Sequence, residues 1–159
     1  ICEYITREDQ SYQYKTIIPC NLYGRHDKFN PNHSHLLPAI IHKVHQAKNN
    51  NENIVEIWGD GLARREFMYA GDFADAILRA VHQFDSLPSY MNVGLGHDYT
   101  INNYYQAVAD VIGFEGSFIH NLDKPVGMTR KLVNIDRQTS WGWSPKHDLT
   151  LGIQKTYEF

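Results

Sequence analysis

The chain has 159 residues, the length of one ordinary domain. Hydrophobic residues make up 42% and charged residues 21%, so the chain can bury a core and does not have the composition of a disordered protein. The formal net charge of −3 argues against a broad nucleic-acid-binding surface. No run of about 18 apolar residues occurs, so no membrane-spanning helix is predicted. The two cysteines, Cys2 and Cys20, show no metal-binding spacing and favour a reducing, cytoplasmic setting.

Segments typical of strands alternate with segments typical of helices. Apolar runs predict extended segments at residues 16–18, 54–58, 66–69, 90–93 and 117–120. Apolar residues at helical spacing predict helices over residues 34–48, 71–84, 100–111 and 148–157. In the second of these helices, the residues expected to face inward are Ala74, Ile77, Ala80, Val81 and Phe84. This alternation predicts an α/β fold.

Polar residues near predicted turns are candidates for a functional site. His35 stands at the start of a predicted helix, where the helix N-terminus disfavours an imidazolium and favours a neighbouring anion. The pairs Arg64-Arg65 and Arg130-Lys131 each adjoin a turn that contains glycine. If the pairs converge, they can hold a diphosphate through charge-assisted hydrogen bonds; the alternative is that both are solvated surface charges.

Three further residue types invite a functional reading. Trp58 ends a predicted strand beside the first basic pair, so it could cover a base or a sugar, or equally fill the core. Cys20 has no cationic neighbour in the sequence, and we interpret it as a small buried hydrophobe rather than a nucleophile. A metal site needs three or four converging ligands, and we interpret His33, His42 and His45 as polar helix positions, so no metal site is predicted.

The chain contains none of the short motifs that mark a self-contained active site. Gly94-Leu95-Gly96 has Tyr99 where the third glycine of a dinucleotide-binding turn would fall. The phosphate-binding loop, the HExxH and GxSxG motifs and a Tyr-x-x-x-Lys pair are also absent from the sequence. A complete dinucleotide enzyme should begin with a glycine-rich turn between a strand and a helix, which this chain does not do.

Longer motifs resemble the GDP-L-fucose synthase family. They are residues 19–27 (Pro-Cys-Asn-Leu-Tyr-Gly-Arg-His-Asp), 30–39 (Asn-Pro-Asn-His-Ser-His-Leu-Leu-Pro-Ala), 58–61, 64–67, 92–96 and 124–132. The Gly-Asp-Gly and Arg-Glu-Phe segments are shared widely by extended short-chain dehydrogenases, whereas the first two segments are more specific. Members of the family epimerise C3 and C5 of GDP-4-keto-6-deoxy-D-mannose and then reduce its C4 ketone with NADPH.

The resemblance implies roles for single residues. His35 matches the acid of the epimerisation step and also lies against the cofactor. The cofactor-binding residues that it implies for NADP(H) are Pro19, Cys20, Asn21, Leu22 and His35. The implied GDP-sugar-binding residues are Lys43, Trp58, Arg65 and Lys131, of which the last two contact the diphosphate.

The match also has departures and gaps. Val126 stands where the family commonly has Asp, and Cys20 where it often has Thr. The family's cofactor loop and its Tyr-x-x-x-Lys pair precede the segment that matches here, so we expect this chain to be the C-terminal half of a Rossmann-type extended short-chain dehydrogenase. The last Rossmann strands are expected at about 15–24 and 67–97, and a smaller α/β substrate lobe at about 25–66 and 98–159. A homodimer is expected from the resemblance.

Two alternative functions stay open. One is a related short-chain dehydrogenase that acts on another nucleotide sugar, such as a 4,6-dehydratase or a 4-epimerase. The other is a non-catalytic remnant that binds a nucleotide sugar without a reductase half.

Overall fold

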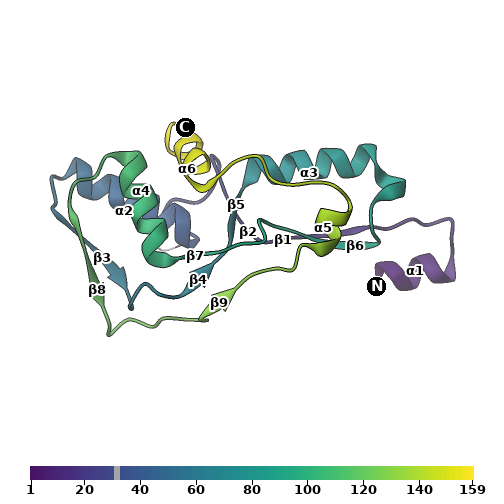
Figure 1. Ribbon diagram of the computed structural model, residues 1–159, viewed down its shortest axis with the longest axis horizontal. Coiled ribbons are helices and arrows are strands. Elements are labelled where there is room, and N and C mark those ends of the chain that lie inside the picture. The colour runs from purple at the N-terminus through teal and green to yellow at the C-terminus, as the bar shows by residue number, and fades with distance from the viewer. Residues whose placement is uncertain (31–32) are drawn as a thin grey trace.

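Parallel strand pairs form the framework of the computed structural model, which describes residues 1–30 and 33–159. β1 (Thr16–Pro19) pairs with β6 (Tyr90–Val93), β2 (Asn21–Tyr23) with β5 (Phe67–Tyr69), and β3 (Ile54–Trp58) with β8 (Ser117–Asn121). The molecule is elongated, with β3 and β8 toward one end and β1 and β6 toward the other (Figure 1). Helices connect the paired strands, which confirms the predicted α/β fold. Pro31 and Asn32, part of one motif segment, lie outside the described residues.

A small three-stranded sheet lies between the two ends (Figure 1). Its central strand, β4 (Arg64–Arg65), is antiparallel to β7 (Tyr99–Thr100) and parallel to β9 (Arg130–Lys131). The register places Arg64 opposite Arg130 and Arg65 opposite Lys131. The two basic pairs therefore lie side by side on neighbouring strands.

The larger core lies around β3 and β5. It is covered by α2 (Leu36–Asn49), α4 (Ile101–Ile112) and α6 (Leu149–Tyr157), three helices that the apolar spacing predicted. Thr100 is the N-cap of α4, and its hydroxyl accepts a hydrogen bond from the Asn103 backbone N–H. Fully buried side chains of this core include Leu37, Val44, Ile57, Tyr104 and Ile153.

A second core lies around β1 and β6. α3 (Ala70–His82), the 3-10 turn η1 (Phe84–Ser86) and α5 (Asp136–Ser140) lie nearby, and α1 (Cys2–Glu8) precedes β1. The buried members of this core are Cys20, Met68, Ala76, Ala80, Leu87, Met91, Val93, Trp141 and Trp143. The short helices α1 and α5 were not predicted, because neither has enough turns to show an apolar period.

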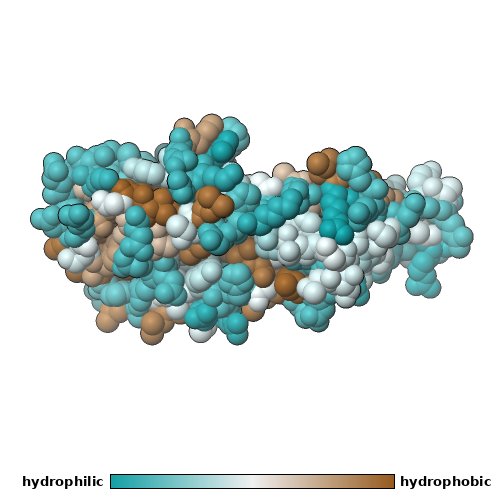
Figure 2. Space-filling view, turned by 45° about the horizontal axis from the view of Figure 1, so that its top comes forward, coloured by the Kyte–Doolittle hydropathy of each residue, from teal (hydrophilic) through white to brown (hydrophobic). Residues whose placement is uncertain are grey.

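The predicted inward face of α3 is wrong at three positions. Ala74, Ile77 and Val81 are exposed, whereas Ala76 and Ala80 are buried. The helix packs through these two small residues, which allow its backbone to approach the sheet, and through Phe73, whereas Ile77, Leu78 and Val81 are exposed. Figure 2 shows brown, apolar surface interrupting the hydrophilic exterior in several places along the molecule. Over residues 1–30 and 33–159, no helix combines the length and apolar character needed to cross a membrane.

Candidate functional site

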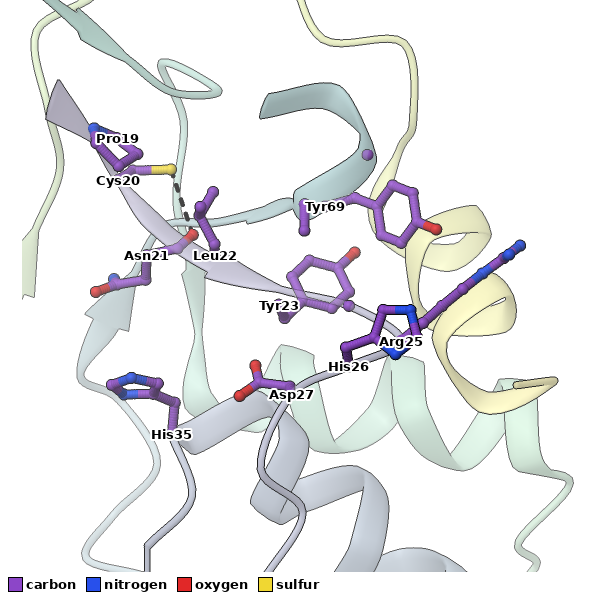
Figure 3. A pocket seen from close by; sticks show the side chains of 13 residues that line it. Pro19, Cys20, Asn21, Leu22, Tyr23, Arg25, His26, Asp27, His35 and Tyr69 are labelled. Carbon is purple, nitrogen blue, oxygen red and sulfur yellow. Dashed lines mark hydrogen bonds between the residues drawn. The ribbon is translucent and has the colours of Figure 1, made fainter. Parts of the chain in front are cut away.

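A cavity opens where β2 ends and where α2 and α3 begin. Its volume of about 730 Å³ is within the range of small-molecule sites. The carboxyl ends of parallel strands are the usual place for a ligand in an open α/β sheet, and this cavity lies at such ends. All five residues expected to bind a cofactor line it (Figure 3): Pro19, Cys20, Asn21, Leu22 and His35.

His35 reaches the cavity from the start of α2. It is the N-cap residue of this helix, but its side chain makes no capping hydrogen bond. The residue is exposed, and Figure 3 shows its ring on the side of β2 toward which the Asn21 amide and the Asp27 carboxylate extend. The imidazole is therefore accessible to a ligand in the cavity.

Cys20 has the opposite environment. Its side chain belongs to the second core, and only 8% of the residue is exposed. Burial, with a smaller contribution from the negative charge of Glu66, raises the pKa of the Cys20 thiol to about 12. A thiol in this state is protonated at neutral pH and is a poor nucleophile. The expected burial of Cys20 is confirmed.

Asn21 connects the cavity to the three-stranded sheet. Its amide nitrogen donates to the Glu66 carbonyl oxygen at 2.8 Å, which orients the side chain. Its amide oxygen accepts a long hydrogen bond of 3.4 Å from the Lys131 ammonium. A residue expected at the cofactor thus touches a residue expected at the substrate diphosphate.

The two basic pairs converge, and two of the four cations, Arg64 and Arg130, share one carboxylate as their partner. Asp98 accepts from Arg64 Nε at 2.6 Å and from Arg130 Nε at 2.5 Å, one bond on each carboxylate oxygen. Burial acts to raise the pKa of Asp98, but the hydrogen bonds and charges of the two arginines outweigh it and hold the pKa below its usual value. Neighbouring residues on a strand point to opposite faces. Arg65 and Lys131 therefore face away from this ion-pair cluster.

The backbone and the following loop hold Arg65 in place. Tyr104, which is fully buried, donates its hydroxyl hydrogen to the Arg65 carbonyl oxygen at 2.9 Å. The Arg65 guanidinium donates through Nη1 to the Arg64 carbonyl oxygen at 2.8 Å. A Cβ atom at Gly127 would lie 3.6 Å from Nη2, so the loop after Lys124 passes beside the guanidinium. The half-buried side chain has a defined position at the edge of β4.

Trp58, the last residue of β3, lies next to Lys124, where the loop that passes Arg65 begins. It is 58% exposed, and the Lys124 ammonium is 5.2 Å from its ring centroid. Gly59 has φ +72°, and a Cβ there would come within 2.6 Å of Val126, so Val126 packs directly on the turn after Trp58. Val126 therefore makes an apolar contact within the protein at the position where the sequence resemblance led us to expect Asp.

Lys43 does not line the cavity. Its ammonium donates to the carbonyl oxygen of Glu56, two residues before Trp58 on β3. Burial lowers the pKa of Lys43, and the negative charge of Glu56 opposes this shift. This side chain covers backbone groups at the edge of β3 and stays apart from the contacts that join Asn21, Lys131 and Arg65.

Two buried carboxylates that organise the site were not singled out from the sequence. Asp98 pairs the two arginines, and Glu66, 1% exposed, accepts from the backbone N–H groups of Leu95 at 2.6 Å, Gly96 at 3.0 Å and Val133 at 2.9 Å. Glu66 belongs to the Arg-Glu-Phe segment, which could have drawn attention to it. Asp98 stands in a polar stretch without any motif, and its partners are more than thirty positions away. In the described ranges, no three His, Cys, Asp or Glu side chains gather as a metal ion would require.

Comparisons with known proteins identify the family. A model of the NAD dependent epimerase/dehydratase family matches residues 1–96. The chain belongs to this family. It is 52% identical over 159 residues to the GDP-L-colitose synthase of Yersinia pseudotuberculosis and 50% identical over 159 residues to the GDP-L-fucose synthase of Azorhizobium caulinodans. These matches include all of this chain but 52% and 51% of the relatives, so it spans about half of their length.

Solved structures of similar proteins share the fold. The GDP-mannoheptose C4 reductase MlghC of Campylobacter jejuni, with NADP bound, superposes with a TM-score of 0.84 at 28% identity, covering 99% of this chain and 55% of that one. A GDP-L-fucose synthetase from Naegleria fowleri gives a TM-score of 0.83 at 23% identity, covering 98% of this chain and 48% of that one. The family's Rossmann-type architecture is thus present here, as the sequence resemblance implied.

Proposed function

We propose that this chain forms the nucleotide-sugar side of an NADPH-dependent epimerase-reductase that converts GDP-4-keto-6-deoxy-D-mannose to GDP-L-fucose. The observation that carries the proposal is the placement of Arg65 beside Lys131, connected through Asn21 to a cavity lined by His35. A paired guanidinium and ammonium suit a diphosphate. Relatives named for GDP-L-fucose and GDP-L-colitose support a GDP-sugar as the ligand.

The cavity fits one end of NADP(H). Residues 19–22 border it, and in the described part of the chain β2 has a partner strand on one edge only, so backbone N–H and C=O groups on the other edge can pair with a planar carboxamide. MlghC, which shares the fold, was solved with NADP bound. The bound cofactor would supply a hydride for reduction of the ketone. Pro19, Cys20, Asn21 and Leu22 would position its nicotinamide end.

The residues divide the chemistry between them. Epimerisation beside a ketone needs one group that removes a proton and another that returns a proton to the opposite face. In this proposal His35, which lines the cavity, returns that proton. Arg65 and Lys131 hold the diphosphate, and the exposed ring of Trp58 offers a surface to the base or the sugar. Lys43 supports β3 beneath Trp58, and its proposed contact with substrate is the weakest of the set because its ammonium already has a partner.

The surfaces of β1 and α3 support the proposed domain organisation. In the described part of the chain, β1 pairs with β6 only, so one of its edges is open. Ile77, Leu78 and Val81 on α3 are exposed. Open parallel strands and bare apolar helix faces are normally covered in a doubly wound sheet. We therefore place residues 15–24 and 67–97 in a larger cofactor-binding sheet. From the family resemblance we further propose that the whole enzyme is a cytoplasmic homodimer.

A second candidate substrate follows from the relative named GDP-L-colitose synthase. L-Colitose lacks the hydroxyl group that L-fucose carries on C3, so the corresponding keto sugar needs epimerisation at C5 only. The identities to the colitose and fucose synthases are 52% and 50%, which do not separate the two.

The test is turnover by the protein expressed from its complete reading frame. GDP-4-keto-6-deoxymannose should oxidise NADPH, and the product should be GDP-L-fucose by chromatography. The 3-deoxy keto sugar is the competing substrate, and the larger kcat/KM assigns the activity. The proposal would be contradicted if neither GDP-keto sugar supported oxidation of NADPH while a UDP-linked keto sugar did. That result would favour another nucleotide-sugar dehydrogenase. Binding of GDP without binding of NADPH would favour a non-catalytic remnant.

A further inference from the structure

One buried carboxylate divides the four cations of β4 and β9 into two groups. Arg64 and Arg130 are partners in the strand register, and each donates through Nε to a different oxygen of Asp98. Arg64 also donates through Nη2 to the Asp98 carbonyl oxygen at 2.8 Å. The Asp98 side chain is 1% exposed, whereas the side chains of Arg64 and Arg130 are 43% and 58% exposed.

The remaining cations lie on the opposite face. Arg65 and Lys131 are also register partners, and strand geometry turns them away from Asp98. Their side chains donate hydrogen bonds to neutral oxygens, the Arg64 carbonyl and the Asn21 amide. In the described residues, the ion-pair contacts of this sheet are all with Asp98, so Arg65 and Lys131 keep their full charge for a ligand.

The alignment of these two cations depends on the alignment of β4 and β9. Each of these strands has two residues, so few backbone hydrogen bonds join them. Asp98 lies beside β7 and bonds one arginine from each strand, which makes it a bridge across β4 and β9. Shifting β9 by one position would turn Lys131 to the wrong face.

We propose that Asp98 is a positioning residue: by pairing with both Arg64 and Arg130 it holds β4 and β9 in register, so that Arg65 and Lys131 can both bind the diphosphate of a nucleotide. This inference rests on the proposed function, because it assumes a diphosphate ligand. In this role Asp98 does not contact the ligand. Removing its negative charge should therefore weaken the binding of the diphosphate, although the loss of a nearby negative charge would by itself strengthen the binding of an anion.

The test is the Asp98→Asn variant of the protein expressed from its complete reading frame, titrated calorimetrically with GDP and with guanosine. We expect the Kd for GDP to rise about tenfold, the equivalent of one charge-assisted hydrogen bond, while guanosine binding stays unchanged. The matched control is Asp123→Asn, which removes the same charge from an exposed residue in the neighbouring loop and should leave GDP affinity unchanged or slightly improved.

Other results would contradict either the positioning role of Asp98 or the diphosphate site itself. Unchanged or tighter GDP binding by Asp98→Asn contradicts the positioning role, and equal weakening of GDP and guanosine reduces Asp98 to general support of the fold. Arg64→Gln provides a second variant that leaves Asp98 paired with Arg130; it should weaken GDP binding by a smaller factor and leave guanosine unaffected, and wild-type GDP affinity would also contradict the inference. A wild-type protein that binds guanosine but gains nothing from the diphosphate would refute the proposed site itself.

Discussion

Replacing Arg65 with alanine should selectively weaken the binding of the nucleotide diphosphate. The guanidinium is half-buried and held beside the Gly127 loop, so little reorganisation is needed before it binds. A hydrogen bond to a charged group contributes about 1.5–3 kcal/mol. Loss of this interaction should raise the Kd for GDP by about tenfold to about 150-fold. The Kd of Arg65→Lys for GDP should lie between those of the wild type and Arg65→Ala, because lysine keeps the charge but lacks the planar pair of donors.

The assay is calorimetric titration with GDP, GMP and guanosine. The loss should be largest for GDP and absent for guanosine. Arg7→Ala is the matched control, since it removes the same charge from an exposed arginine of α1 and should leave all three affinities unchanged. Equal affinities of Arg65→Ala and wild type for GDP would refute the diphosphate assignment. Equal losses for GDP and guanosine would mean that Arg65 supports the fold or the base instead.

Three further predictions concern buried groups. Cys20→Thr should change kcat/KM by less than about threefold, because a thiol with a pKa of about 12 supplies no thiolate at neutral pH; a loss of about 100-fold would make Cys20 a reacting group. Glu66→Gln should lower the free energy of unfolding by about 2–4 kcal/mol in urea titrations, because it leaves a buried N–H unpaired. The control Glu115→Gln, at an exposed residue, should change it by less than about 0.5 kcal/mol, and equal effects of the two variants would contradict the buried role of Glu66. Burial raises the pKa of Tyr105 to about 12, so ionisation of this group leaves the free energy of unfolding unchanged below about pH 10 and lowers it as the pH rises toward 12. Compared with wild type, Tyr105→Phe should lack tyrosinate absorbance that develops near pH 12, and loss of absorbance that develops near pH 10 would contradict the prediction.

The longer helices and strands could be predicted from apolar spacing, because each buries a face of its own. α4 shows this well: Thr100 caps it, and Tyr104, Tyr105 and Val108, which lie at helical spacing, are buried. α3 shows where apolar spacing fails to predict the buried face of a helix. Its apolar residues surround much of the helix, and which of them face inward depends on the close approach of Ala76 and Ala80 to the sheet, which no periodicity specifies.

The residue types of the site could be predicted from the sequence, but not which of the cations pair with a carboxylate inside the protein and which face a ligand. Convergence of the two basic pairs was one of two alternatives that the residues left open. The local pattern does not distinguish Arg64 from Arg65, and only the family resemblance implied that Arg65 and Lys131 are the diphosphate contacts. The opposite directions of Arg64 and Arg65 follow from a two-residue strand, and the partner that distinguishes them, Asp98, is 34 positions from Arg64. Strand pairing between distant segments is a tertiary property, and propensity carries little information about strands this short.

The most direct measurement is a crystal structure of the protein expressed from its complete reading frame with GDP and NADP⁺ bound. We expect diphosphate oxygens at about 3 Å from both the Arg65 guanidinium and the Lys131 ammonium. We also expect the nicotinamide end of the cofactor against residues 19–22, with His35 facing the space between the two ligands. A diphosphate bound away from Arg65 and Lys131, or a cavity at His35 that neither ligand reaches, would contradict the proposal.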